Sequence, residues 1–221
     1  MPELSDGAEV TPEAKRDARI ALLAARRSLT APRRAEAAAR VQAELISLVR
    51  RLRPARVTAY VPVGTEPGGP DLPEVLRAAL EPTAELLLPV LRDDLDLDWA
   101  EYVDGVPLAA AGRGLREPTG PRLGTSAVAD AALVVVPALA VDRGGRRLGR
   151  GGGSYDRALA RVPAVTLTVA LLHDGELVER LPAEPHDRPV RAAITPADGL
   201  RTLAGAPGVG RHASAGRTRV P

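Results

Sequence analysis

The chain has 221 residues and a formal net charge of +2, which is enough length for one sizeable globular domain. It contains no Phe and no Cys, so the core must be built from aliphatic side chains, and disulfides, thiolate metal sites and catalytic thiols are excluded. No segment reaches the roughly 18 apolar residues of a membrane span, and the acidic first ten residues lack a signal-peptide pattern, which favours a cytoplasmic protein without membrane association.

Arginine replaces lysine almost everywhere, because Lys15 is the only lysine among 30 lysine and arginine residues. This bias makes the abundance of arginine a weak argument for nucleic-acid binding, and the basic first two helices carry no interleaved aromatic residues for stacking. We therefore expect no nucleic-acid partner. The sequence leaves two explanations open for Lys15. Either the position needs a compact ammonium group, or the lysine has been retained by chance in a chain that otherwise uses arginine.

Two helices are predicted at the start of the chain, after residues 1–10, which we expect to be disordered. The first begins at Thr11-Pro12-Glu13, where a hydroxyl cap, a proline and an acid follow one another. The second begins near Thr30 and ends before Pro54. Apolar residues share one face of each helix: Ala18, Leu22, Ala25 and Leu29 in the first, and Val41, Leu45, Leu48 and Leu52 in the second.

Apolar runs alternate with glycine- and proline-rich loops over the rest of the chain. Strands are predicted at residues 57–61, 85–91, 97–103 and 165–172, and a buried strand within the apolar run 131–141. Helices are predicted at 71–80 and near 155–160, and loops at 64–70 and 106–125. The single α/β domain is expected to span residues 11–196, and residues 197–221 are expected to form a disordered tail.

Unbroken runs of leucine and β-branched residues between helices indicate a mostly parallel sheet that is covered on both faces. In such sheets, ligands gather beyond the carboxyl ends of the strands. The loops after Val61 and after Val141 are therefore expected to share one site.

A glycine-rich segment, residues 147–157, is predicted to bind phosphate. Three consecutive glycines allow backbone amides to turn inward, and Arg147 and Arg150 can each donate two hydrogen bonds to phosphate oxygens. The alternative is a flexible surface loop. The segment is not a Walker motif, because no Gly-Lys-Ser or Gly-Lys-Thr follows, and Ser154 stands where a dinucleotide fingerprint has its last glycine.

Two carboxylates could hold a magnesium ion that bridges nucleotide phosphates, namely Asp156 after the loop and Asp187 in Glu184-Pro185-His186-Asp187. Taken alone, each aspartate is more typical of a helix cap or a turn. His173 and His186 are likewise more typical of structural or exposed positions, because no metal-spaced histidine cluster occurs.

Dispersed motifs in this order resemble the signature of the 5-formyltetrahydrofolate cyclo-ligase family, also called methenyltetrahydrofolate synthetase. They extend from about residue 14 to residue 195 and comprise Lys15 with Arg19, the Glu66 loop, Leu88-Pro89-Val90, Glu117-Pro118, residues 137–142 with Gly145, residues 147–153, Tyr155-Asp156-Arg157, and residues 181–187. The resemblance implies a three-layer α/β/α fold with a mostly parallel sheet, similar to the NagB/RpiA/CoA-transferase-like architecture. It also implies ATP- and magnesium-dependent cyclisation of 5-formyltetrahydrofolate to 5,10-methenyltetrahydrofolate, with release of ADP and phosphate and no obligate protein partner.

Positions that match the family's motifs imply roles for single residues. Lys15 and Arg150 are implied to be catalytic, and Asp156 and Asp187 to bind magnesium. ATP is implied to contact the first helix and the loop at Lys15, Arg16, Asp17, Ala18, Arg19, Arg147, Leu148, Gly149, Arg150, Gly151, Gly152, Gly153, Ser154 and Tyr155. The folate is implied to contact Val61, Glu66, Arg150, Gly151, Gly152, Gly153 and Ser154.

Two positions depart from the pattern of many relatives. Ser154 stands where they have the first of two tyrosines, which puts a stacking or hydroxyl contact at this position in doubt, and Gly152 stands where some have a lysine. Two other functions remain open at this point. One is a nucleotide- or sugar-phosphate-binding module that lost the chemistry, and the other is RNA binding through the basic helices.

Overall fold

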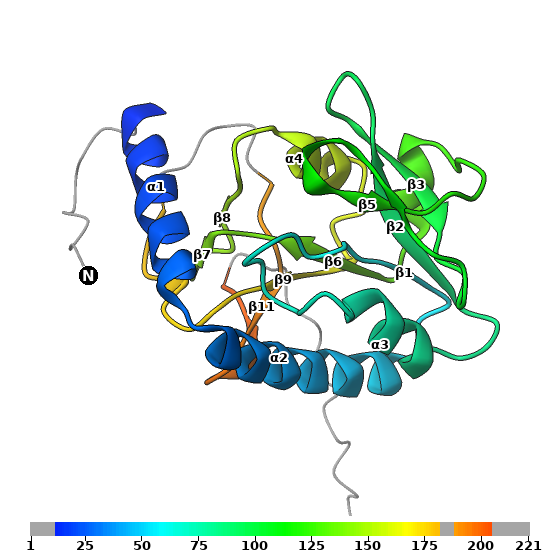
Figure 1. Ribbon diagram of the computed structural model, residues 1–221, viewed down its shortest axis with the longest axis horizontal. Coiled ribbons are helices and arrows are strands. Elements are labelled where there is room, and N and C mark those ends of the chain that lie inside the picture. The colour runs from blue at the N-terminus through cyan, green and yellow to red at the C-terminus, as the bar shows by residue number, and fades with distance from the viewer. Residues whose placement is uncertain (1–11, 182–187, 205–221) are drawn as a thin grey trace, which may run out of the picture.

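The computed structural model describes residues 12–181 and 188–204 (Figure 1). At its centre is a seven-stranded sheet with the strand order β12-β11-β9-β6-β1-β2-β3. Five neighbouring strands, from β11 to β2, are parallel, and the edge strands β12 and β3 are antiparallel to their neighbours. The strands are β1 (Arg56–Thr58), β2 (Glu85–Leu91), β3 (Leu97–Glu101), β6 (Leu133–Pro137), β9 (Leu167–Leu171), β11 (Ala192–Thr195) and β12 (Gly199–Thr202). The expected α/β class with a mostly parallel sheet is confirmed.

Helices cover both faces of this sheet, as Figure 1 shows. Helices α2 (Ala31–Leu52) and α3 (Leu72–Ala79) pack on one face. Helix α4 (Ser154–Ala160) and the 3-10 helix η2 (Thr125–Asp130) pack on the other. Helix α1 (Pro12–Ser28) lies apart from these layers, beside strands of a smaller sheet.

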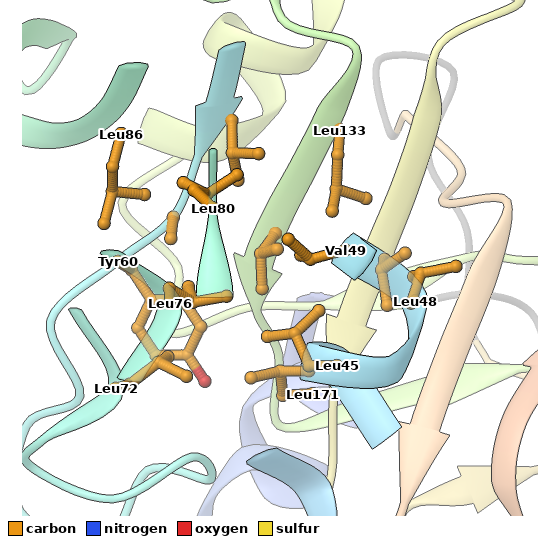
Figure 2. Close-up of a cluster of buried hydrophobic side chains, with 14 of the residues drawn as sticks. Leu45, Leu48, Val49, Tyr60, Leu72, Leu76, Leu80, Leu86, Leu133 and Leu171 are labelled. Carbon is orange, nitrogen blue, oxygen red and sulfur yellow. The ribbon is translucent and has the colours of Figure 1, made fainter. Parts of the chain in front are cut away.

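Successive residues of the central strands point to opposite faces, so both faces are apolar. Leu86 and Leu88 join the cluster under α2 and α3, part of which is drawn in Figure 2, whereas Leu87 joins the cluster under α4. The predicted face of α2 is largely correct, because Val41, Leu45 and Leu48 are buried. The prediction was wrong for Leu52, which is 45% exposed, and for Ala25 of α1, which is also exposed.

Two small sheets flank the central one. Strand β7 (Ala140–Asp142) pairs with β8 (Arg147–Leu148) and β10 (Leu177–Val178). Strands β4 (Ala109–Ala110) and β5 (Arg116–Glu117) form a hairpin around the short helix η1 (Gly112–Gly114), in the region that the sequence predicted to be loop throughout. The apolar run 131–141 contains two strands of different sheets, β6 and β7, because the chain turns at Ala138 and Leu139.

The boundary predicted at residue 196 was wrong. Strand β12 lies beyond it and pairs with β11 over four residue pairs, and Leu203 is buried, so the folded domain continues at least to Ala204. Residues 1–11 and 205–221 lie outside the described part of the chain. The predictions of disorder in these two segments therefore stay predictions. None of the described helices is long and apolar enough to cross a membrane.

Gly145, in the turn between β7 and β8, allows a close approach of two backbone segments. Its φ is 87°, and a Cβ atom there would lie 2.2 Å from the carbonyl oxygen of Val190. We expect Gly145→Ala to lower the free energy of unfolding by about 2–3 kcal/mol in urea titrations. Gly175→Ala is the matched control, because Gly175 also has a positive φ of 83°, but a Cβ atom there would have no neighbour within 4 Å. We expect it to cost only about 1 kcal/mol, and equal losses would contradict the role of the Val190 contact.

Candidate functional site

A cavity of about 420 Å³ opens beyond the carboxyl ends of β1 and β6. Its lining comes from α1, the loop after β1, strands β2 and β3, the β4–β5 hairpin and the glycine-rich loop. The lining contains seven basic side chains against three acidic ones: Lys15, Arg19, Arg26, Arg113, Arg116, Arg147 and Arg150 against Glu66, Glu117 and Asp156. A cavity of this size and charge can hold a small anionic ligand.

The loop after β1 and the glycine-rich loop meet in this cavity. Nε of Arg150 lies 3.1 Å from Oε1 of Glu66, and the arginine side chain is half exposed. The second oxygen of Glu66 accepts a hydrogen bond from the amide of Val63 at 2.9 Å. The expectation that these two loops share one site is therefore confirmed.

The glycine-rich loop needs glycine at two of its three central positions. Gly151 and Gly153 have φ values of 101° and 68°, which side chains rarely adopt. Gly152 has no positive φ, and the nearest atom to a Cβ there would be Oγ of Ser154 at 3.6 Å. Position 152 can therefore carry a side chain without backbone strain.

Helix α1 brings only some of its predicted residues to the cavity. Lys15 and Arg19, four residues apart on one face, line it, and Nε of Arg19 donates to the carbonyl of Gly149 at 3.0 Å. Arg16 and Asp17 pair with each other on the outer side, with exposed side-chain fractions of 71% and 73%. Residues 16–18 are not part of the described lining, and Ala18 packs on Ala140, Leu148 and Leu181 instead. Within residues 15–19, Lys15 and Arg19 therefore face the cavity, whereas residues 16–18 lie on other faces of the helix.

Arg147 joins the loop to the helix that follows it. Its Nη2 donates to Oδ1 of Asp156 at 2.8 Å, and its guanidinium lies 5.9 Å from the ring centroid of Tyr155. Nε of Arg147 is buried and has no acceptor among the residues that the structure describes. Arg147 therefore fastens the loop to helix α4 through Asp156 and Tyr155.

Two tyrosines of the cavity stay protonated over the physiological pH range. Burial is the main cause that raises the pKa of Tyr155 far above its usual value, and the nearby Glu66 carboxylate raises it further. Burial, followed by Glu66, also raises the pKa of Tyr60, whose hydroxyl donates to the carbonyl of Pro67 at 2.7 Å. These phenols can act as apolar surface or as hydrogen-bond donors, but not as phenolates.

Comparison with known proteins identifies the family to which this site belongs. The model of the 5-formyltetrahydrofolate cyclo-ligase family matches residues 11–196. The chain belongs to the 5-formyltetrahydrofolate cyclo-ligase family. It is 42% identical over 199 residues to a 5-formyltetrahydrofolate cyclo-ligase of Mycolicibacterium smegmatis, covering 88% of this chain and 100% of the relative. It is also 45% identical over 65 residues to the enzyme of that name from Escherichia coli, which covers 29% of this chain and 36% of the relative.

Solved structures agree with this membership. The 5,10-methenyltetrahydrofolate synthetase of Aquifex aeolicus superposes with a TM-score of 0.68 at 28% identity, covering 91% of this chain and 99% of that one. That of Mycoplasma pneumoniae gives 0.63 at 15% identity over 81% and 96% of the two chains, and this likeness shows the fold alone.

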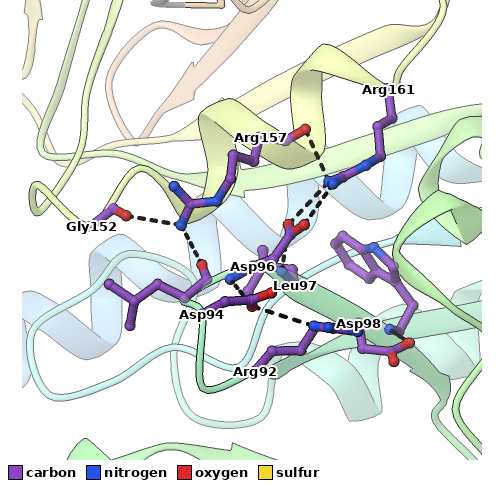
Figure 3. Close-up of polar contacts among 10 residues, drawn as sticks. Arg92, Asp94, Asp96, Leu97, Asp98, Gly152, Arg157 and Arg161 are labelled. Carbon is purple, nitrogen blue, oxygen red and sulfur yellow. Dashed lines mark hydrogen bonds and ion pairs between the residues drawn. The ribbon is translucent and has the colours of Figure 1, made fainter.

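In this member of the cyclo-ligase family, the turn between β2 and β3 supports the glycine-rich loop (Figure 3). Nη2 of Arg157 donates to the carbonyl of Leu95 at 2.6 Å and to that of Gly152 at 3.1 Å. The guanidinium of Arg161 forms two hydrogen bonds with the carboxylate of Asp96, at 3.0 and 2.5 Å. Helix α4 is therefore fastened to the turn by two arginines one helical turn apart, and this fixes the end of the loop.

The contact with Arg161 predicts a pH-dependent effect of Asp96→Asn. Hydrogen bonds from Arg161, together with the Leu97 amide, hold the pKa of Asp96 below its usual value. A lowered pKa in the folded state contributes stability above the unfolded pKa of about 3.9. This contribution is lost as the pH falls through the lower value. We expect the substitution to cost about 1–2 kcal/mol of unfolding free energy at pH 7.

The difference between wild type and variant should shrink as the pH falls below about 4, which urea titrations at several pH values would measure. Asp93→Asn is a suitable control, because Asp93 lies in the same turn but is exposed. A difference that stays constant between pH 7 and pH 3 would contradict the role of the charge.

Arg26 is a residue of this site that the sequence analysis missed. Its side chain is 1% exposed, and Nε and Nη2 donate to the two carboxylate oxygens of Glu176 at 2.7 and 2.8 Å. Nη2 also donates to the carbonyl of Ala138. A signal was present, because Lys15, Arg19 and Arg26 follow one another at spacings of four and seven, which places them on one face of α1. The general excess of arginine concealed it.

The residues proposed for magnesium binding are described only in part. Asp156 lines the cavity, with 20% of its side chain exposed, and one of its oxygens is paired with Arg147. Asp187 and His186 lie outside the described residues. Within residues 12–181 and 188–204, no group of three or more histidine, cysteine or acidic side chains is placed to hold a metal ion. One available carboxylate oxygen still fits magnesium, which commonly binds through one or two carboxylates, phosphate oxygens and water.

Proposed function

We propose that this protein catalyses the ATP- and magnesium-dependent cyclisation of 5-formyltetrahydrofolate to 5,10-methenyltetrahydrofolate, with release of ADP and phosphate. The observation that carries the proposal is the meeting of the glycine-rich loop and the Glu66 loop in one cationic cavity, joined by Arg150 and Glu66 at 3.1 Å. A phosphate-binding wall and a carboxylate that can recognise an amino-substituted ring therefore face the same space. Family membership supports the identity of the folate.

The chemistry explains why ATP is required. The formamide oxygen on N5 is a poor leaving group, so ring closure needs its conversion to a phosphate ester. Transfer of the γ-phosphoryl group from ATP to this oxygen releases ADP. N10 then attacks the formyl carbon, loses its proton, and phosphate departs with the former formyl oxygen.

The basic residues of the cavity can stabilise the negative charge of phosphoryl transfer, which depends mainly on positioning and electrostatics. Lys15 and Arg19 would contact the triphosphate from α1, and the glycine-rich loop would contribute its amides. Helix α4 has only seven residues, so we assign the binding to loop amides and guanidinium groups and not to a helix dipole. Arg150, which is half exposed, can turn from Glu66 to the transferred phosphoryl group and leave Glu66 free to accept hydrogen bonds from the pterin.

Magnesium, when bound with ATP, would supply charge neutralisation between phosphate oxygens. Asp156 and Asp187 would hold it. Arg147 would orient Asp156 for this task, because it binds one carboxylate oxygen and lies almost wholly buried.

A turnover assay tests the proposal. We expect near-ultraviolet absorbance of the methenyl product to grow when 5-formyltetrahydrofolate, ATP and magnesium are mixed with the protein, and not when ATP is omitted. Binding of ATP without any absorbance change would favour the second candidate, a nucleotide-binding module that has kept the loop without the reaction. Affinity for RNA that falls steeply with salt would favour nucleic-acid binding instead.

Asp156→Asn tests the assignment of the metal. We expect the magnesium concentration that gives half-maximal turnover to rise about tenfold, because a neutral amide is a weaker ligand for a hard cation. Magnesium titrations at saturating ATP would measure this rise. Asp130→Asn is the control, since Asp130 lies on η2 with 76% of its side chain exposed. An unchanged titration for Asp156→Asn would remove this residue from the metal site.

A further inference from the structure

His173 lies just beyond the carboxyl end of β9, at the same edge of the sheet as the cavity. It is 6% exposed and does not belong to the described lining of the cavity. Its backbone amide donates to Oε2 of Glu176 at 2.7 Å, and the amide of Glu176 returns a bond to the carbonyl of His173 at 3.2 Å. These two bonds form a tight turn from His173 to Glu176. The ion pair of Glu176 with Arg26 then attaches this turn to α1.

The imidazole reaches the turn that carries Glu66. Nε2 of His173 lies 3.0 Å from the carbonyl oxygen of Thr65, the residue that immediately precedes Glu66. A carbonyl can only accept, so Nε2 must carry the proton in this contact. The bond spans 108 residues of sequence and joins the segment after β9 to the loop after β1.

The turn that carries Glu66 is held on both sides, by the hydroxyl of Tyr60 at Pro67 and by the imidazole of His173 at Thr65. Gly64 has a φ of 63°, a conformation that glycine adopts without strain, and a Cβ atom there would meet no other atom within 4 Å. Within the turn, the amide of Glu66 donates to the carbonyl of Val63 at 3.2 Å, and Oε2 of Glu66 accepts from the amide of Val63. These two bonds fold the turn, whereas its attachment to the core comes from Tyr60 at Pro67 and from His173 at Thr65. The imidazole of His173 supplies such an attachment, one residue away from the carboxylate.

We propose that His173 is a positioning residue for folate recognition, which holds the Thr65 carbonyl and thereby fixes the direction in which Glu66 presents its carboxylate. The inference rests on the proposed function, in which Glu66 binds the pterin. His173 acts through the turn and touches neither substrate. Its loss should weaken the binding of folate and leave the nucleotide side of the cavity unchanged, because Lys15, Arg19 and the glycine-rich loop belong to other elements.

His173→Leu and His173→Gln test the proposal as a pair. Leucine fills space without a donor, whereas the amide nitrogen of glutamine can replace the Nε2 donor. We expect His173→Leu to raise KM for 5-formyltetrahydrofolate about tenfold, as the loss of one hydrogen bond to a positioned carbonyl would do. KM for ATP should change less than about twofold. His173→Gln should restore most of the affinity for folate, although both variants lose the imidazole.

A double-substitution cycle separates positioning from general stability. In the Glu66→Gln background, His173→Leu should raise KM for folate by less than about twofold, because the group through which it acts is already altered. Thermal unfolding of all variants would be measured in parallel. Equal increases in KM for folate and ATP, no recovery with glutamine, or additive effects in the cycle would each overturn the proposal.

Calorimetric titration of the wild-type protein with 5-formyltetrahydrofolate in the absence of ATP distinguishes a failure of the proposed reaction from a failure of the proposed role of His173. Binding without turnover would refute the proposed reaction, and the variants could still be compared by their affinity. Normal turnover with no difference between His173→Leu and His173→Gln would refute the role of His173 alone. A wild-type protein that neither binds nor converts the folate would overturn both.

Discussion

Lys15→Met is expected to lower kcat for cyclisation by about 10²- to 10³-fold, the loss typical when a preorganised charge at a reacting group is removed. Lys15 lines the cavity from α1 and is 5% exposed, so it belongs to the wall of the site and not to the outer surface. In such a sheltered position, a positive charge acts more strongly on a phosphoryl group than it would in water.

Methionine is chosen because it keeps the length of the side chain and avoids a cavity. Kinetics at saturating folate, with kcat and KM for ATP measured separately, would give the effect. Arg150→Ala should also reduce turnover strongly while it leaves the melting temperature nearly unchanged, because half of that side chain is exposed. Arg27→Met is the control on the same helix, since Arg27 is exposed and is not part of the described lining.

Lys15→Arg tests whether the compact ammonium group matters in a chain that uses arginine almost everywhere. Recovery of wild-type kcat by arginine would mean that only the charge is needed. If Lys15→Met lowered the melting temperature as severely as it lowered activity, a role in folding would replace the role in catalysis.

The elements with strong periodicity could be predicted from the sequence. The strand at residues 85–91 agrees with β2 residue for residue, and α2 ends before Pro54 as its pattern required. The glycine-rich loop was found because positions such as Gly151 and Gly153 need backbone conformations that other residues avoid. Local chemistry decides these features, so a single sequence reveals them.

Features that depend on distant contacts could not be predicted in the same way. The run 131–141 is apolar throughout, and nothing in its composition marks where the chain leaves one sheet for another. Strand β12 was missed because its polar, half-exposed residues resemble a tail until β11 pairs with them. For the site, the family motif placed residues 15–19 together, but only the helix shows that Lys15 and Arg19 face the cavity while Arg16 and Asp17 face outward.

The buried ion pair of Arg26 and Glu176 is where a single substitution should affect stability most. Arg26→Met would leave the carboxylate of Glu176, itself almost fully buried, without the two hydrogen bonds it receives from the guanidinium. Removing one partner of such a pair usually costs about 3–5 kcal/mol, because the remaining charge is buried and uncompensated. We expect a loss of this size for Arg26→Met in urea titrations, and a smaller loss for Glu176→Gln, which keeps an acceptor for the guanidinium.

The double variant Arg26→Met, Glu176→Gln should be more stable than the sum of the single losses predicts, with a coupling energy of about 2–3 kcal/mol. Arg40 and Glu36 provide a matched control, since their charged atoms are also 2.8 Å apart, but their side chains are 59% and 64% exposed. The same cycle there should give only about 0.3–0.5 kcal/mol. Similar coupling in both pairs would show that burial does not determine the strength of the Arg26 contact. A large difference would show that this buried pair contributes strongly to holding α1, which carries Lys15 and Arg19, against the segment of His173.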